Sequence, residues 1–118
     1  MTHPVRFVLY IPGSNARALD KARGLAADAI IFDLEDAVAP DEKAAAREVL
    51  AQALAAGGYG ARLRIVRING LDTAWGGDDI ARFGAMAEVE ALLIPKVNTP
   101  AELDAVAGLA PQKPLWAM

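Results

Sequence analysis

Residues 29–36 read AIIFDLED, an apolar run that passes directly into three carboxylates within four positions. Consecutive β-prone apolar residues are typical of a buried strand. Such a strand cannot pack Asp33, Glu35 and Asp36 inward, because burying an unpaired carboxylate costs far more free energy than burying an apolar side chain gains. The cluster therefore predicts the mouth of a site, with a cation, a basic side chain or a proton as its partner.

Strands and helices alternate on either side of this stretch. The expected strands, all apolar and β-prone, are 7–11, 29–32, 63–68, 91–94 and a last piece at 114–118. The expected helices are one that Ser14 or Asn15 caps and that runs to Gly24, one over 40–56, and two that begin at Asp78-Asp79 and at Thr99-Pro100. Because strand and helix alternate, we expect right-handed βαβ units and a parallel sheet covered by helices on at least one face.

Two α/β architectures fit this alternation: an open doubly wound sheet, or the first part of a (β/α)8 TIM barrel, which normally needs about 250 residues. A nucleotide-binding open sheet usually has a glycine-rich turn after its first strand, and the turn at 12–15 has only Gly13. In a barrel, polar residues recur at the C-terminal end of strand after strand, because all these ends face one mouth. They recur in this chain, so the sequence predicts the N-terminal part of a TIM barrel, about strands 1–5, and no linker divides it.

Composition excludes several classes of function. The 118 residues carry a net charge of -3 and a pI near 5.0, which gives no general attraction to nucleic acid or anionic lipid. No stretch reaches the roughly 18 apolar residues that span a bilayer. The chain has no cysteine, which excludes disulfides and thiol nucleophiles and favours the cytoplasm. The single histidine, His3, excludes a His-dependent triad or a multi-His metal site within this chain.

The polar side chains at the expected strand ends form one candidate site. They are Ser14, Asp33, Glu35, Asp36, Arg67, Asn69 and Lys96. Period-two geometry puts Arg67 and Asn69 on one face of the strand 63–68, so they can act together. An arginine on a rigid strand suits a carboxylate, because its planar fork makes two parallel charge-assisted hydrogen bonds. The expected ligand is an organic acid, and the acidic cluster could hold Arg67 or Lys96, or bind waters around magnesium.

Each assignment has a structural alternative. Arg67 could simply neutralise Asp33 or Glu35 in an ion pair, and Lys96 could be a solvated strand-end lysine. Asp36 could cap a helix or stabilise a turn. On the helix 40–56, Lys43 and Arg47 have a spacing that suits a solvated or ion-paired face, or a small anion patch.

Four motifs stand in the order and spacing of the citrate lyase beta-subunit-like proteins, which belong to the HpcH/HpaI aldolase and citrate lyase family. The motifs are YIPGSN at 10–15, DLEDAV at 33–38, VRIN at 66–69 and LIPKV at 93–97. The resemblance covers nearly the whole chain. It implies a TIM barrel and magnesium-dependent, reversible carbon–carbon cleavage of a 3-hydroxy acid or its acyl-CoA thioester, such as citryl-CoA or malyl-CoA. The products would be an oxo acid and acetate or acetyl-CoA.

The resemblance also implies roles for individual residues. Arg67 resembles the arginine that binds the substrate carboxylate in the family. Asn69 and Lys96 are further candidates for substrate binding. Glu35 and Asp36 resemble an acidic pair near the waters of the metal, and Ser14 and Arg17 are candidates for the CoA path. The direct magnesium ligands of the family follow the fifth and sixth strands, beyond residue 118. We therefore expect residues 1–118 to form an incomplete barrel domain with little activity alone.

Two further functions are compatible with the sequence. A metal-bound acyl-CoA site can also catalyse a reaction with water, so hydrolysis of a malyl-CoA-like thioester is an alternative to carbon–carbon cleavage. A non-catalytic half-barrel that acts as an assembly module is another. By resemblance, the protein is expected to form a homo-oligomer, a trimer or a hexamer.

Overall fold

The computed structural model describes residues 8–24, 28–35, 37–60, 63–70, 73–94, 108 and 114–117. The predictions for Asp36, Lys96 and the helix at Thr99-Pro100 lie outside these residues, as does His3. No helix among the described residues is both long enough and apolar enough to cross a bilayer.

The sheet has five parallel strands in the sequential order β1-β2-β3-β4-β5. The strands are β1 (Val8–Pro12), β2 (Ala29–Asp33), β3 (Leu63–Arg67), β4 (Ala91–Ile94) and β5 (Leu115–Ala117). A doubly wound sheet reverses its strand order at a switch point, whereas a barrel adds each strand beside the previous one. The sequential order therefore confirms the N-terminal part of a TIM barrel.

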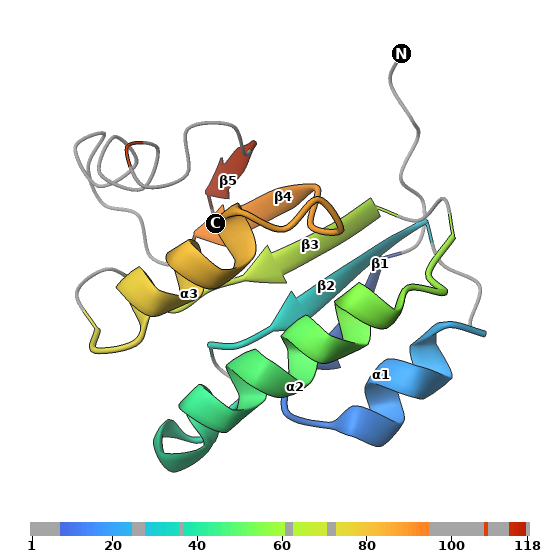
Figure 1. Ribbon diagram of the computed structural model, residues 1–118, viewed down its shortest axis with the longest axis horizontal. Helices are drawn as coiled ribbons and strands as arrows, with labels where there is room; N and C mark the ends of the chain where they lie inside the picture. The colour runs from blue at the N-terminus through green and yellow to red at the C-terminus, as the bar shows by residue number, and fades with distance from the viewer. Residues whose placement is uncertain are drawn as a thin grey trace.

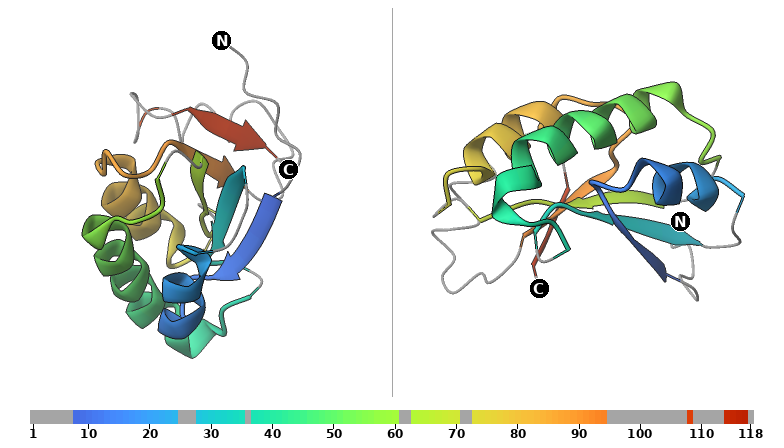
Figure 2. Two further views of the ribbon diagram at one scale, coloured as in Figure 1. Left: turned by 90° about the vertical axis from the view of Figure 1, so that its right-hand side faces the viewer. Right: turned by 90° about the horizontal axis from the view of Figure 1, so that it is seen from below.

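The helices α1 (Ala16–Ala22), α2 (Lys43–Ala56) and α3 (Gly76–Gly84) lie on the same face of the sheet (Figures 1 and 2). Asn15 caps α1 as expected, since its side-chain oxygen accepts a hydrogen bond from the Ala18 amide at 3.0 Å. The helix expected from residue 40 begins as a 3-10 turn, η1 (Pro40–Glu42), and becomes α-helical at Lys43.

The start of α3 differs from the expectation. The helix begins at Gly76, two residues before the acidic pair that was expected to supply its start. The hydroxyl of Thr73 accepts from the Trp75 and Gly76 amides at 3.4 and 3.2 Å, so this side chain satisfies donors of the first turn. Asp78 and Asp79 instead lie inside that turn, where negative charge is favoured by the helix dipole.

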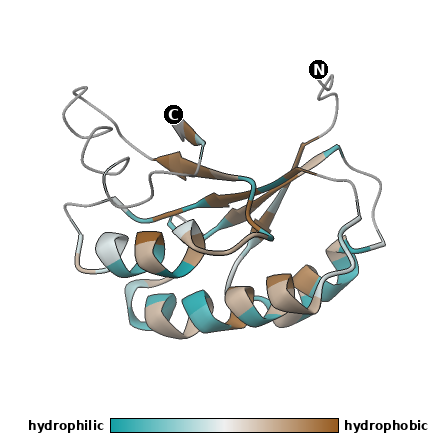
Figure 3. Ribbon diagram, turned by 45° about the horizontal axis from the view of Figure 1, so that its top comes forward, coloured by the Kyte–Doolittle hydropathy of each residue, from teal (hydrophilic) through white to brown (hydrophobic). Residues whose placement is uncertain are grey.

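The alternation of side chains divides the sheet into two apolar faces, and most of the strand residues are apolar (Figure 3). The helix-side core joins strand residues such as Phe32, Val66 and Leu92 to the apolar stripes of the helices. The other face carries a smaller cluster of Ala29, Ile31, Ile65, Ala91 and Leu93. This second face is the one that lines the interior of a barrel, so polar side chains that follow it point toward the barrel axis.

Candidate functional site

Arg67 and Asp33 end neighbouring strands and form a bidentate ion pair. They stand opposite each other in the parallel register of β2 and β3. The guanidinium Nε donates to Asp33 Oδ1 at 2.8 Å, and the terminal NH2 group donates to Asp33 Oδ2 at 2.5 Å. Both residues are buried, with 8% and 4% of their surface exposed. The pair therefore fixes the plane of the guanidinium at the carboxyl end of the sheet.

Asp33 also organises the loop that follows β2. Its Oδ1 accepts from the Glu35 amide at 2.8 Å, and its Oδ2 accepts from the Ala37 amide at 3.1 Å. Burial raises the pKa of Asp33, but the hydrogen bonds from Arg67 and these amides, with the charge of Arg67, outweigh burial and lower the pKa below its usual range. Asp33 is consequently held as a carboxylate.

Glu35 brings a second carboxylate to the same guanidinium. Its Oε1 lies 4.0 Å from the NH2 group of Arg67, and its side chain is 15% exposed. The structural alternative, in which Arg67 neutralises acidic neighbours, is thus present in the molecule. That Arg67 binds a substrate carboxylate and that Glu35 lies near the waters of a metal both stay predictions.

Asn69 belongs to a different group of hydrogen bonds. It is 2% exposed. Its Oδ1 accepts from Lys43 Nζ at 2.7 Å, and its Nδ2 and backbone N donate to Asp79 Oδ2 at 2.7 and 2.9 Å. Because β3 ends at Arg67, the period-two alternation stops there, and Asn69 turns toward residues of α2 and α3. The side chain of Asn69 thus binds Lys43 and Asp79, whereas Arg67 binds Asp33, and the role of Asn69 in substrate binding stays a prediction.

Lys43 and Arg47 hold this second group together. The Lys43 Nζ also donates to the backbone oxygens of Leu34 and Glu35 at 3.0 and 2.8 Å. Arg47 Nε donates to Asp79 Oδ1 at 2.9 Å. The ion-paired alternative is thus observed for Arg47, whereas Lys43 is buried at 7% exposure and is neither solvated nor part of an anion patch.

Sequence reasoning missed the role of Lys43. Its partners come from the loops after β2 and β3, up to 26 positions away along the chain. The one available signal was a lysine at the start of a helix, where the dipole disfavours a cation and a compensating partner is needed.

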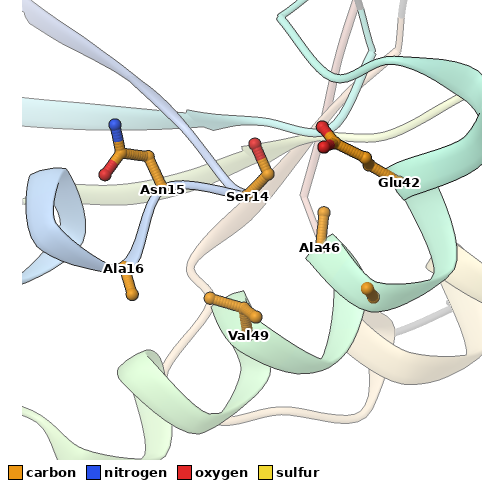
Figure 4. A pocket seen from close by; sticks show the side chains of 7 residues that line it. Ser14, Asn15, Ala16, Glu42, Ala46 and Val49 are labelled. Atoms are coloured by element: carbon orange, nitrogen blue, oxygen red, sulfur yellow. The ribbon is translucent and has the colours of Figure 1, made fainter.

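A pocket of about 430 Å³ opens between the loop after β1 and the start of α2 (Figure 4). Its lining residues are Ser14, Asn15, Ala16, Glu42, Ala45, Ala46 and Val49. Ser14, a candidate for the CoA path, lies in this pocket, while the exposed Arg17 is not among the lining residues. Among the described residues, the lining has one carboxylate, that of Glu42, and no cation, so this part of it suits a neutral polar group better than a phosphate.

The described part of the chain contains no group of three or more His, Cys, Asp or Glu side chains that could hold a metal ion. Asp33 is occupied by Arg67 and two backbone amides. Asp33 therefore does not fit as a direct magnesium ligand.

Three known proteins show what the chain is similar to. The (3S)-malyl-CoA thioesterase of Cereibacter sphaeroides strain KD131 is 64% identical over 116 residues, which are 98% of this chain and 40% of that protein. The L-malyl-CoA/beta-methylmalyl-CoA lyase of C. sphaeroides strain ATCC 17029 is 40% identical over 108 residues, 90% of this chain and 34% of that protein. The crystal structure of protein CitE from Mycobacterium tuberculosis, in complex with magnesium, acetoacetate and coenzyme A, matches with a TM-score of 0.73 and 28% identity.

That structural match covers 93% of this chain and 38% of the CitE chain. The chain thus spans about 40% of the length of the thioesterases that it matches. Residues 6–114 match the model of the HpcH/HpaI aldolase/citrate lyase family, and the chain belongs to that family.

Proposed function

We propose that the protein hydrolyses the thioester of a malyl-CoA-like acyl-CoA, releasing the free hydroxy acid and CoA. The observation that carries this proposal is the 64% identity to a (3S)-malyl-CoA thioesterase over 98% of the chain. In this reaction the oxygen of water bonds to the acyl carbon, the carbon–sulfur bond breaks, and the thiol leaves with a proton. This order of preference reverses the one drawn from sequence, in which carbon–carbon cleavage came first.

The Arg67–Asp33 pair would bind and orient the free carboxylate of the substrate. Because the guanidinium is already held in one plane, its side chain loses little conformational entropy when the ligand binds to its donors. The formal charges of Asp33, Glu35 and Arg67 sum to one negative charge, which opposes an incoming carboxylate. A divalent cation would offset that charge, which supports magnesium as part of the proposal, with ligands other than the described residues.

Product analysis tests the proposal on protein expressed from its complete gene. Malyl-CoA is incubated with the protein and magnesium, and the products are separated by chromatography. Free malate and CoA in equal amounts are the expected result. Glyoxylate and acetyl-CoA instead of malate would refute hydrolysis.

Two variants of β3 test the part played by Arg67. Arg67→Lys keeps the charge and loses the fork, and we expect kcat/KM to fall roughly 10- to 100-fold, as for loss of a charged hydrogen bond. Arg64→Lys is the matched control, because Arg64 binds the backbone oxygens of Glu88 and Gly60 and an oxygen of Glu90, away from Arg67. Equal kcat/KM in the two variants would remove Arg67 from the site.

Carbon–carbon cleavage is the second candidate. It is favoured by the 40% identity to a malyl-CoA lyase and would appear in the same assay as glyoxylate and acetyl-CoA. A homo-oligomer, a cytoplasmic location and a CoA path past Ser14 and Arg17 belong to the same proposal. A stable oligomer with neither activity nor magnesium binding would leave the assembly module as the function.

A further inference from the structure

We propose that Lys43 is a positioning residue that locks the loops after β2 and β3 to one another and thereby sets the place of Glu35 beside Arg67. One ammonium group donates to three oxygens: the backbone oxygens of Leu34 and Glu35, and Oδ1 of Asn69. The first two follow β2 and the third follows β3. A single side chain of α2 therefore joins two loops at the carboxyl end of the sheet.

The position of Lys43 carries two costs that only its partners offset. Lys43 is the first residue of α2, where the positive end of the helix dipole disfavours a cation. It is also buried, and removing an ammonium from water is expensive unless hydrogen bonds replace the lost solvation. The three bonds are 2.7 to 3.0 Å long, which is the range of well-formed hydrogen bonds. The same nitrogen lies over the Trp75 ring, 5.3 Å from its centroid, and this adds a cation–π contact.

The loop after β2 is held from both sides. On the barrel-interior side, Asp33 accepts from the amides of Glu35 and Ala37. On the helix side, Lys43 donates to the carbonyls of Leu34 and Glu35. The backbone of Glu35 is thus fixed through both its amide and its carbonyl, and its carboxylate lies beside Arg67 as a result. Without Lys43 the loop keeps only the Asp33 contacts and a 3.4 Å bond from the Val38 amide to the Glu35 oxygen, so it is held less firmly and the Glu35 and Ala37 amides open more often.

The matched comparison is Lys43→Met against Arg23→Met. Arg23 also donates to backbone oxygens, but at the other end of α2. Its Nε and NH2 donate to the oxygens of Gly57 and Ala53 at 2.6 and 2.8 Å. It also lies 4.8 Å from the centre of the Tyr59 ring. Both variants remove a cation from backbone carbonyls and an aromatic face, but only Lys43 touches the loop of Glu35. A role in stability alone predicts the same outcome for both.

The first readout is catalysis, and it rests on the proposed function. Using protein from the complete gene, kcat and KM are measured at a temperature where both variants are folded by circular dichroism. We expect Lys43→Met to lower kcat by about tenfold or more, because small misplacements of groups in a site are costly, and Arg23→Met to stay within about twofold of the parent. Equal kcat values in the two variants would overturn the inference. If Lys43→Met does not fold, Lys43→Gln, which keeps an amide donor, replaces it under the same criterion.

The second readout does not depend on activity. Hydrogen exchange of the Glu35 and Ala37 amides is followed in the parent, Lys43→Met and Arg23→Met. We expect exchange at both amides to accelerate in Lys43→Met by about tenfold or more and to stay at the parent rate in Arg23→Met. Unchanged exchange in Lys43→Met overturns the inference. A parent without thioesterase or lyase activity refutes the proposed function, and the exchange result then decides the role of Lys43.

Discussion

Gly76 and Gly77 allow a sharp test of how α3 packs on the loop after β3. A Cβ added at Gly76 would lie 2.1 Å from the Gly70 backbone oxygen and 2.8 Å from the Asn69 backbone oxygen. A Cβ added at Gly77 meets nothing within 4 Å. Both glycines lie in the first turn of α3, and neither has a positive φ. Replacing each by alanine therefore compares the same chemical change with and without a steric conflict.

The cost of Gly76→Ala can be worked from these distances. Real Cβ atoms keep at least 3.0 Å from such neighbours, so helix and loop must separate by about 0.9 Å to reach even that limit. The Asn69–Asp79 hydrogen bonds, at 2.7 and 2.9 Å, cross the same gap and would be stretched out of range. Overpacking costs about 1–3 kcal/mol, and a lost bond to a charged group about 1.5–3 kcal/mol. We expect a destabilisation of about 3–5 kcal/mol.

Urea unfolding of protein from the complete gene, followed by circular dichroism, measures the difference. Gly76→Ala should lower the midpoint with an unchanged slope, whereas Gly77→Ala should be neutral or stabilising by up to about 1 kcal/mol from its better helix propensity. If the two variants differ by less than about 1 kcal/mol, α3 does not pack on the loop as the structure has it, and the reasoning fails.

Three further predictions concern the buried Asp33, the buried Tyr59 and the proposed magnesium. Asp33→Asn should destabilise the protein by about 3–5 kcal/mol at neutral pH, because Arg67 loses its paired charge. Since folding lowers the pKa of Asp33, this stabilisation is present above about pH 4 and is lost as the pH falls; a urea-midpoint difference that does not shrink on acidification would contradict this. Tyr59→Phe should cost about 0.5–1.5 kcal/mol in urea unfolding, because the Tyr59 hydroxyl donates to the backbone oxygen of Leu19 at 2.9 Å. Burial raises the pKa of Tyr59, so stability should fall as the pH rises past about 10, and less steeply in the variant. Chelation with EDTA should abolish turnover and added magnesium should restore it; turnover that survives chelation would separate the proposed reaction from the metal.

Sequence reasoning succeeded where a property repeats along the chain. The alternation of apolar runs with helix signals predicted the parallel sheet, and the family inferred from four motifs is confirmed by the match over residues 6–114. Period-two alternation holds within β3, where Ile65 and Val66 lie in the two different apolar clusters. It did not extend to Asn69, because the alternation holds only while the backbone is a strand, and β3 ends at Arg67.

The types of residue in the candidate site could be predicted from the sequence, but which of them bind one another could not. Carboxylates after β2 and an arginine at the end of β3 could be expected to meet, since adjacent parallel strands end at the same edge. Which carboxylate the arginine binds depends on the register, and the register places Asp33 opposite Arg67 with Glu35 at 4.0 Å. A shift of the pairing would exchange these partners without altering any pattern along the chain.

The sequence by itself determined the order of the elements and the acidic and basic character of the carboxyl end of the sheet, because these depend on residue type, local propensity and periods of two and 3.6 residues. The barrel was predicted from polar residues that recur at the strand ends, and the observed strand order confirms it. Only the tertiary structure decided that Asp33 forms an ion pair with Arg67 and that Lys43 joins the loops after β2 and β3. The physical reason is that hydrogen bonds and ion pairs act over about 3 Å in space. Residues separated by 34 positions, such as Asp33 and Arg67, come that close only when strand register and helix packing bring them together.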